Sequence, residues 1–157
     1  MRRFHGTATD PSCYFGVDVR KPPCTSKTCA VCRICSDTFQ IKFAGSRAGQ
    51  RMALRYGEGL YFSATSSKSN DYAEGSEKEI RGERYRMMFM CKVAAGFAYL
   101  DKDGNIPSID IQTKVHDGGF DSVVGLVTRE GGALNHDEIV VYRNEAAIPS
   151  YLIVYKI

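Results

Sequence analysis

The sequence predicts an α+β fold that is built mainly on antiparallel sheet and carries only short helices. Residues 85–94 form an almost wholly apolar run bounded by charge and glycine, which is typical of a central strand. Residues 138–142 and 151–157 are strand-like as well, because they are rich in β-branched and aromatic side chains. Strand patterns dominate the chain, and we therefore expect an α+β domain.

The first half of the chain shows only short periodic segments. A half-buried strand is predicted at residues 38–43 and a short helix or loop at 45–56. A glycine turn and a buried strand at 60–62 follow. Next comes a short helix that Thr65 or Ser66 is expected to cap and that runs to about Tyr72. Residues 8–36 have no sustained period, so they need another source of order.

The second half is predicted to hold the longest strands. The methionines and Cys91 within residues 85–94 are expected to be core side chains. Pro149 is predicted to mark the break between the last two strands. The other expected features are a polar, exposed segment at 73–84, a turn at 101–105, and a glycine-rich loop at 117–120 that leads into a strand at 122–124.

The size and charge of the chain limit its class. With 157 residues, of which 43% are hydrophobic, residues 1–157 are expected to form a single domain. The net charge of +3 is small and the basic residues are scattered, so nucleic-acid binding is not indicated. No apolar run reaches the roughly 18 to 20 residues of a membrane span, and no export signal is recognisable, so we expect no membrane association.

Five of the six cysteines cluster in a segment at about residues 13–35. Their spacing includes the Cys-x2-Cys knuckle that tetrahedral zinc commonly uses, and it predicts a zinc-stabilised insertion with four ligands, Cys13, Cys24, Cys29 and Cys32. A set in which Cys35 replaces Cys13 is the competing choice, and without a metal these cysteines would form disulfides or stay free thiols. Four thiolates would saturate the metal, so a structural role is favoured over a catalytic one.

Four separated motifs carry side chains of the types that take part in catalysis or ligand binding. Residues 5–7 read His-Gly-Thr, residues 57–62 read Gly-Glu-Gly-Leu-Tyr-Phe, residues 67–72 read Ser-Lys-Ser-Asn-Asp-Tyr, and Glu138 heads a late strand. Each motif alone is weak, because tyrosines on strands are usually core residues and a glutamate at a strand end is usually solvated. Their joint order and spacing resembles the catalytic domain of the poly(ADP-ribose) polymerase family. Within that family the ending at residues 138–155 is most similar to the tankyrases.

The resemblance implies the ADP-ribosyltransferase fold and a His-Tyr-Glu triad formed by His5, Tyr61 and Glu138. Glu138 would hydrogen-bond the nicotinamide ribose of NAD+ and stabilise the positive charge that develops there. Lys68 would contact Glu138 or the ribose. The NAD-binding residues implied by the family motifs are His5, Gly6, Tyr61, Ser63, Lys68, Ser69 and Tyr72.

Each binding residue has an implied task. Tyr72 would stack on the nicotinamide ring, with Tyr61 on the opposite side. The backbone of Gly6 and the hydroxyl of Ser69 would pair with the carboxamide, and His5 would contact the adenosine ribose. The tankyrases carry a zinc motif too, but theirs follows the Ser-Lys-Ser element, whereas the cysteines here precede the Gly-x-Gly turn, so ligands cannot be transferred.

The function expected from these residues is NAD-dependent transfer of ADP-ribose to protein acceptors, the chain itself included, with single units and chains both compatible. The competing functions are an NAD glycohydrolase, a transferase acting on nucleic acid or a small molecule, and a binding module for NAD or ADP-ribose. We expect a monomer, without the helical regulatory domain that many members carry ahead of the His-Gly motif. The clustered cysteines favour a reducing compartment, cytoplasm or nucleus.

Overall fold

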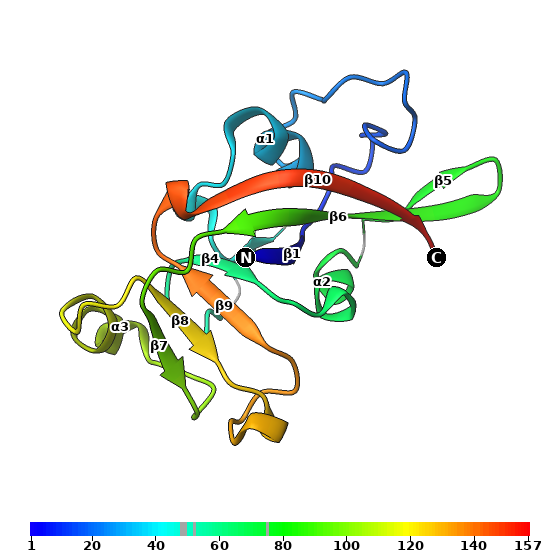
Figure 1. Ribbon diagram of the computed structural model, residues 1–157. Coiled ribbons are helices and arrows are strands. Elements are labelled where there is room, and N and C mark those ends of the chain that lie inside the picture. The colour runs from blue at the N-terminus through cyan, green and yellow to red at the C-terminus, as the bar shows by residue number, and fades with distance from the viewer. Residues whose placement is uncertain (48–49, 52, 75) are drawn as a thin grey trace.

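The first of two β-sheets is organised around β6 (Glu83–Val93) in the computed structural model, which describes residues 1–47, 50–51, 53–74 and 76–157 (Figure 1). β1 (Arg2–Gly6) and β10 (Ala147–Lys156) pair with β6 on its two edges, and β5 (Lys78–Ile80) forms a hairpin with it, all antiparallel. Alternate residues of β6, among them Met87, Phe89 and Cys91, are buried. The predicted central strand and the core position of Cys91 are therefore confirmed.

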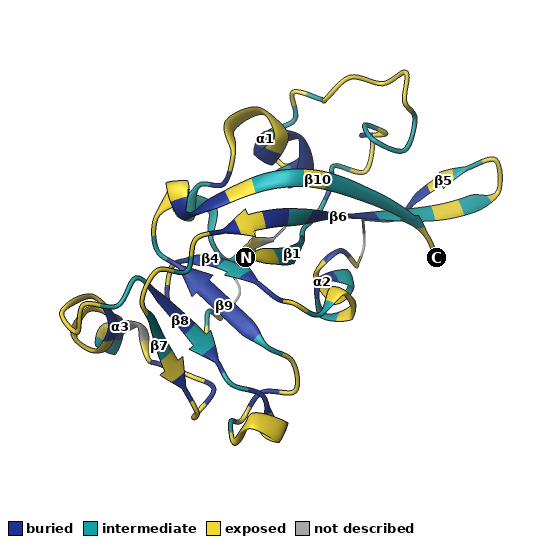
Figure 2. Cartoon of the chain, viewed as in Figure 1, coloured by how far each residue is buried: buried dark blue, intermediate teal, exposed yellow. Residues whose placement is uncertain are grey.

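The second sheet has the strand order β4-β9-β8-β7. It is formed by β4 (Leu60–Phe62), β9 (Glu138–Val141), β8 (Ser122–Gly125) and β7 (Ala98–Asp101). Only the β7–β8 pair in it is parallel, so the sheets are mainly antiparallel, as the sequence predicted. All four residues of β9 are buried, which explains the continuous apolar pattern after Glu138 (Figure 2).

The two sheets meet where β1 and β4 run side by side. Phe4 and Ser63 exchange two backbone hydrogen bonds, with N···O distances of 2.7 and 3.1 Å. α2 (Ser66–Tyr72) then packs on β1 so closely that a Cβ on Gly6 would lie 1.7 Å from the Ser69 carbonyl oxygen. Only glycine fits there. This junction brings the His-Gly motif next to the Tyr-bearing strand and to the Ser-Lys-Ser helix.

The remaining elements are short and surround the sheets. They are α1 (Ala30–Asp37), α3 (Ser108–Ile111) with the π-helical turn η2 (Gln112–His116), the 3-10 turns η1 (Ile41–Phe43), η3 (Thr128–Glu130) and η4 (Asn144–Ala146), and the strand pair β2 (Ser46–Arg47) and β3 (Gln50–Arg51). Each helix in the described part of the chain is too short or too polar to cross a bilayer.

Several sequence-based expectations for local structure were wrong. No strand forms at residues 38–43. Thr38, with a φ of 62°, caps the end of α1, and η1 follows at Ile41–Phe43. Pro149 does not separate the last strands. It lies inside β10, which is an edge strand, at a shift of register. Edge strands and such irregularities are the places in a sheet where proline is tolerated. The break is η4 instead.

The segment at 73–84 is also less exposed than expected. It contains β5, and Lys78 is only 3% exposed because its ammonium group donates to the carbonyl oxygens of Asp10 and Pro11, at 2.6 and 3.0 Å. The helix predicted from Ser66 to Tyr72 is confirmed, but its N-cap residue Thr65 makes no capping hydrogen bond with its side chain. In the expected helix or loop at 45–56, the described residues include β2 and β3, while residues 48, 49 and 52 lie outside the described part.

Candidate active site

A cavity of about 350 Å³ opens at the junction of the two sheets. β1, β4, α2 and the first residue of β9 form one part of its wall, and α1 and η1 form another. All eight residues named from the motifs line this single cavity, although they are far apart in the sequence: His5, Gly6, Tyr61, Ser63, Lys68, Ser69, Tyr72 and Glu138. A cavity with a few convergent polar groups is the usual form of a small-molecule site.

Glu138 and Lys68 form an ion pair in the wall of this cavity. The Glu138 side chain is 6% exposed, and its Oε1 lies 2.8 Å from Nζ of Lys68. Lys68 also donates to the Asp137 carbonyl oxygen at 3.3 Å. A buried carboxylate needs such a partner, because an uncompensated buried charge is strongly destabilising. The contact that the sequence suggested between these two residues is present, and it holds the carboxylate in one orientation.

Asp137 is a site residue that the sequence reasoning missed. Its carboxylate accepts hydrogen bonds from the Ser63 hydroxyl (2.9 Å), the Ala64 N–H (2.7 Å) and the Thr65 hydroxyl (3.0 Å). Burial would raise the pKa of Asp137, but these donors outweigh it and hold the pKa below its ordinary value. Through these hydrogen bonds, Asp137 links the residues directly before α2 to the start of β9. Its position directly before Glu138 was the only signal available in the sequence.

The Asp137→Asn variant is expected to slow any reaction at Glu138 by about tenfold and to lower the free energy of unfolding by about 1–2 kcal/mol, because an amide cannot accept all three hydrogen bonds. Turnover well below the unfolding temperature and thermal unfolding should both be measured. Asp103→Asn, at an exposed site, is the matched control. An unchanged turnover in Asp137→Asn would show that this carboxylate does not position Lys68 and Glu138.

Tyr61 contributes its ring rather than its hydroxyl. The hydroxyl donates to the Gly57 carbonyl oxygen at 2.7 Å and accepts from the Tyr56 N–H at 3.0 Å. Burial raises the pKa of Tyr61, so the phenol stays neutral. Both polar capacities of the hydroxyl are thus used to fix the glycine turn at 57–59. The aromatic face is what Tyr61 offers to a ligand in the cavity.

His5 is held as a neutral ring. Its Nδ1 lies 2.9 Å from the Tyr61 carbonyl oxygen, and its ring contacts Phe39 edge-on with centroids 5.1 Å apart. Burial lowers the pKa of His5 from 6.5, while the hydrogen bond to Tyr61 acts in the opposite direction. A carbonyl oxygen can only accept, so Nδ1 carries the proton and Nε2 is an acceptor. His5 is therefore suited to accept a hydrogen bond from a ligand hydroxyl.

Stability should depend on pH through His5. Above about pH 6.5 the imidazole of His5 is neutral in both the folded and the unfolded chain. At lower pH the unfolded chain binds a proton at His5 that the folded chain does not bind. The free energy of unfolding is expected to fall by up to about 1.4 kcal/mol per pH unit in this range. Urea unfolding between pH 7.5 and 5.5 would show a smaller dependence in His5→Gln than in the wild type. His136→Gln, at an exposed site, should behave like the wild type, and equal slopes in all three would contradict the assignment.

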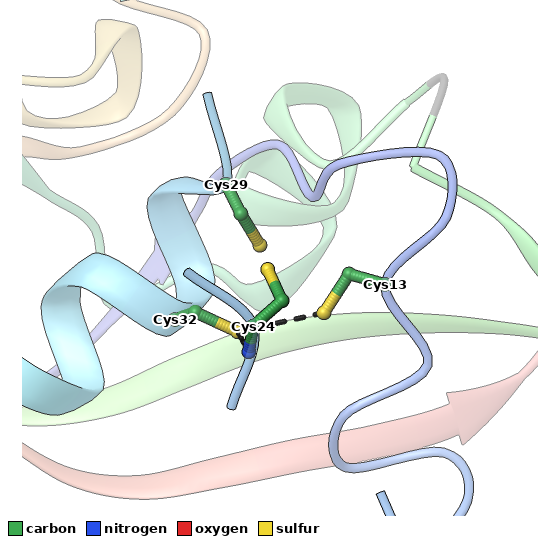
Figure 3. A group of neighbouring side chains, drawn as sticks. All are labelled: Cys13, Cys24, Cys29 and Cys32. Atoms are coloured by element: carbon green, nitrogen blue, oxygen red, sulfur yellow. Dashed lines mark hydrogen bonds between the residues drawn. The ribbon is translucent and has the colours of Figure 1, made fainter. Parts of the chain in front are cut away.

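Four cysteine side chains converge beside α1 (Figure 3). The sulfurs of Cys13, Cys24, Cys29 and Cys32 all lie within 4.8 Å of one another, and the Cys24 N–H donates to Cys32 Sγ at 3.2 Å. All six cysteines are in the described part of the chain, and none forms a disulfide. Cys35 is exposed on α1 and lies outside the cluster. The predicted set, rather than the one with Cys35, is the set that the fold brings together.

The cluster has the chemistry of a metal site. Zinc–sulfur bonds of about 2.3 Å place the sulfurs of a tetrahedral site roughly 3.8 Å apart. The observed limit of 4.8 Å is close to that spacing, and Cys13, Cys29 and Cys32 are almost fully buried. A backbone N–H that points at a sulfur, as at Cys24, is the kind of donor that stabilises a bound thiolate.

Comparison of the sequence with protein families identifies the class of domain. The sequence model of the poly(ADP-ribose) polymerase catalytic domain matches residues 24–157. The matched segment includes Tyr61, Lys68 and Glu138, and it begins after His5 and Cys13.

Proposed function

This chain belongs to the family of poly(ADP-ribose) polymerase catalytic domains, and from that premise we propose that it transfers ADP-ribose from NAD+ to protein acceptors, itself included. Membership in the family implies NAD-dependent ADP-ribosyl transfer in general. The observation that carries the proposal is the Lys68–Glu138 ion pair, which lines the same cavity as Gly6, Ser69 and Tyr72. The motifs at 67–72 and 138–155 favour a tankyrase-like subtype.

In the proposed mechanism, the nicotinamide half of NAD+ lies against α2. Its ring stacks on Tyr72, with the face of Tyr61 on the other side, and its carboxamide pairs with the Gly6 backbone and the Ser69 hydroxyl. Ser63 supports this wall from the β1–β4 junction. The close packing of Gly6 on Ser69 supports the arrangement, because it fixes both groups before the ligand arrives.

The bond between nicotinamide and ribose then breaks, and its electron pair leaves with the nicotinamide. The ribose develops positive charge, which the Glu138 carboxylate stabilises while it accepts a hydrogen bond from the 2′-hydroxyl. Lys68 keeps the carboxylate oriented. His5 accepts a hydrogen bond from the adenosine ribose through Nε2 and sets the register of the dinucleotide. The nucleophile of the acceptor forms the new bond at the ribose carbon that nicotinamide has left.

We assign the cysteine cluster a structural Zn²⁺ held by Cys13, Cys24, Cys29 and Cys32. Four thiolates complete a tetrahedral shell and leave no position for a reactive water, so the metal would order residues 13–35 rather than take part in transfer. This role fits the lack of periodic structure in that segment, where α1 is the one helix among the described residues.

The test of the proposed function follows the fate of NAD+ labelled in its adenosine half. Label bound to protein is expected, and a smear or a sharp band on a gel separates chains from single units. Free labelled ADP-ribose in place of bound label would indicate a glycohydrolase. Intact NAD+ after incubation with folded protein and candidate acceptors would overturn the proposal and leave a binding module.

A further inference from the structure

We propose that Arg33, on the helix that the cysteine cluster anchors, binds the diphosphate of NAD+ in the candidate cavity. The inference rests on the proposed function and extends it to the half of the substrate to which the motifs assign only His5. The residues concerned lie within residues 8–46, between the His-Gly and Gly-x-Gly motifs, where no family motif was recognised.

The first observation is that α1 and η1 form a part of the cavity wall separate from α2. Arg33 lines the cavity from α1, Phe43 lines it from η1, and Lys27 lines it from the segment before α1. Phe39, which follows α1, contacts the ring of His5 with centroids 5.1 Å apart. This wall is therefore adjacent to the residue proposed to bind the adenosine ribose. The diphosphate joins that ribose to the nicotinamide ribose, so it must pass nearby.

The second observation is the state of the Arg33 guanidinium. Its central carbon lies 3.7 Å from the centroid of the Phe43 ring, and Nη1 donates to the Lys27 carbonyl oxygen at 3.0 Å. Among the interactions of the described residues, that bond is the only hydrogen bond from this guanidinium, and it forms no ion pair with a carboxylate. A guanidinium has five N–H donors in a planar fork, so most of its donors are available to a ligand.

The third observation is the charge around the cavity. The described wall carries four basic side chains and one carboxylate: Lys27, Arg33, Arg55, Lys68 and Glu138. Lys68 is neutralised by Glu138, and Arg55 donates to the Gly104 carbonyl oxygen at 3.2 Å. Lys27, Arg33 and Arg55 form no ion pair among the described residues, and two of these three cations, Lys27 and Arg33, lie on the α1 side of the cavity. A diphosphate supplies two negative charges and paired oxygens, which the fork of an arginine recognises better than a point charge does.

The fourth observation ties the cluster to this site. Arg33 directly follows Cys32 and lies four residues after Cys29, and both cysteines belong to the cluster. The same short helix thus connects the metal-type site to the cavity wall. Cluster-held backbone and the Phe43 ring would fix the guanidinium before the ligand binds, which reduces the entropy lost on binding.

The experiment measures the binding of separate halves of the substrate to the full chain by calorimetry. Benzamide probes the nicotinamide end, adenosine probes the nucleoside, and ADP and ADP-ribose add the diphosphate. In Arg33→Gln, the affinities for ADP and ADP-ribose are expected to fall about tenfold, whereas the affinities for benzamide and adenosine should change by less than about twofold. Arg20→Gln is the matched control, because Arg20 is an exposed arginine of the same segment.

The possible outcomes separate the two proposals. Wild-type protein that binds neither benzamide nor ADP-ribose overturns the proposed function and this inference with it. Wild-type binding of both ligands, with ADP-ribose affinity unchanged in Arg33→Gln, overturns only the inference. Metal content is measured in parallel, and loss of zinc from Arg33→Gln would mean that Arg33 balances the charge of the cluster instead.

A second variant, Arg33→Lys, tests the same assignment if Arg33→Gln does not fold. Arg33→Lys keeps the charge but removes the planar fork and its stacking on Phe43, so ADP-ribose should bind roughly threefold more weakly, with benzamide unchanged. Equal weakening of both ligands, or of neither, in folded Arg33→Lys would overturn the assignment.

Discussion

The Glu138→Gln variant is expected to lose ADP-ribosyl transfer by about 100-fold or more, the largest effect of any single substitution at this site. Glutamine has the same shape as glutamate, so the cavity is preserved, but the negative charge that stabilises the ribosyl cation is lost. Lys68 also loses the carboxylate 2.8 Å from its Nζ and becomes a partly buried cation without an ion-pair partner. Nicotinamide release under single-turnover conditions measures the chemical step directly.

Binding and folding controls make this result interpretable. The affinity for benzamide should change by less than about threefold, because the nicotinamide contacts come from α2 and β1 rather than from Glu138. Glu145→Gln, at an exposed position soon after β9, should react like the wild type. Unchanged turnover in a folded Glu138→Gln protein would remove Glu138 from the proposed triad.

The second large effect is expected on stability, from loss of the cysteine cluster. One zinc per chain should be found by elemental analysis. Cys29→Ser should abolish it and lower the free energy of unfolding by about 3 kcal/mol or more, since metal binding contributes directly to folding in such sites. Cys29 is 0% exposed and lies at the start of α1, so the helix and the cavity wall should lose order together. Thermal unfolding with and without a chelator measures the change.

Cys35→Ser provides the matched control for the cluster. Cys35 lies on the same helix but is exposed and outside the cluster, so its replacement should leave the zinc content and the unfolding temperature unchanged. Equal effects of Cys29→Ser and Cys35→Ser would contradict the ligand set. A folded and active preparation without metal would end the zinc assignment.

Sequence-based predictions were correct where a pattern within a few residues is enough to determine the local structure. β6 was predicted from an almost wholly apolar run that is bounded by charge and glycine. The helix α2 was predicted from a Ser/Thr cluster at its start, although Thr65 makes no capping hydrogen bond with its side chain. The four cysteines were chosen from their spacing, and the fold brings those four together. The motif residues also line one cavity, so their joint order along the chain carried real information about proximity. Their roles in NAD+ binding stay proposals.

Long-range contacts explain the failures. Residues 38–43 alternate like a strand, but Phe39 is buried against His5, Phe62 and Phe89 from other elements, and the backbone follows that packing instead of its own period. Lys78 looks like an exposed charge, yet it is buried because two carbonyl oxygens, 68 and 67 residues away, accept hydrogen bonds from its ammonium group.

The fold class, the main strands, the set of four cysteines and the family motifs could be predicted from the sequence alone, because each depends on residue types within a short stretch of the chain. Only the tertiary structure revealed that Asp137 links the start of α2 to the start of β9, and that Arg33 is a cation on the cavity wall with no ion pair among the described residues. Asp137 acts on Ser63 and Thr65, which lie 74 and 72 residues away. Arg33 lines the same cavity as Glu138, although more than 100 residues separate them. Such roles depend on which hydrogen-bond and charge partners folding supplies, and no local pattern encodes those partners.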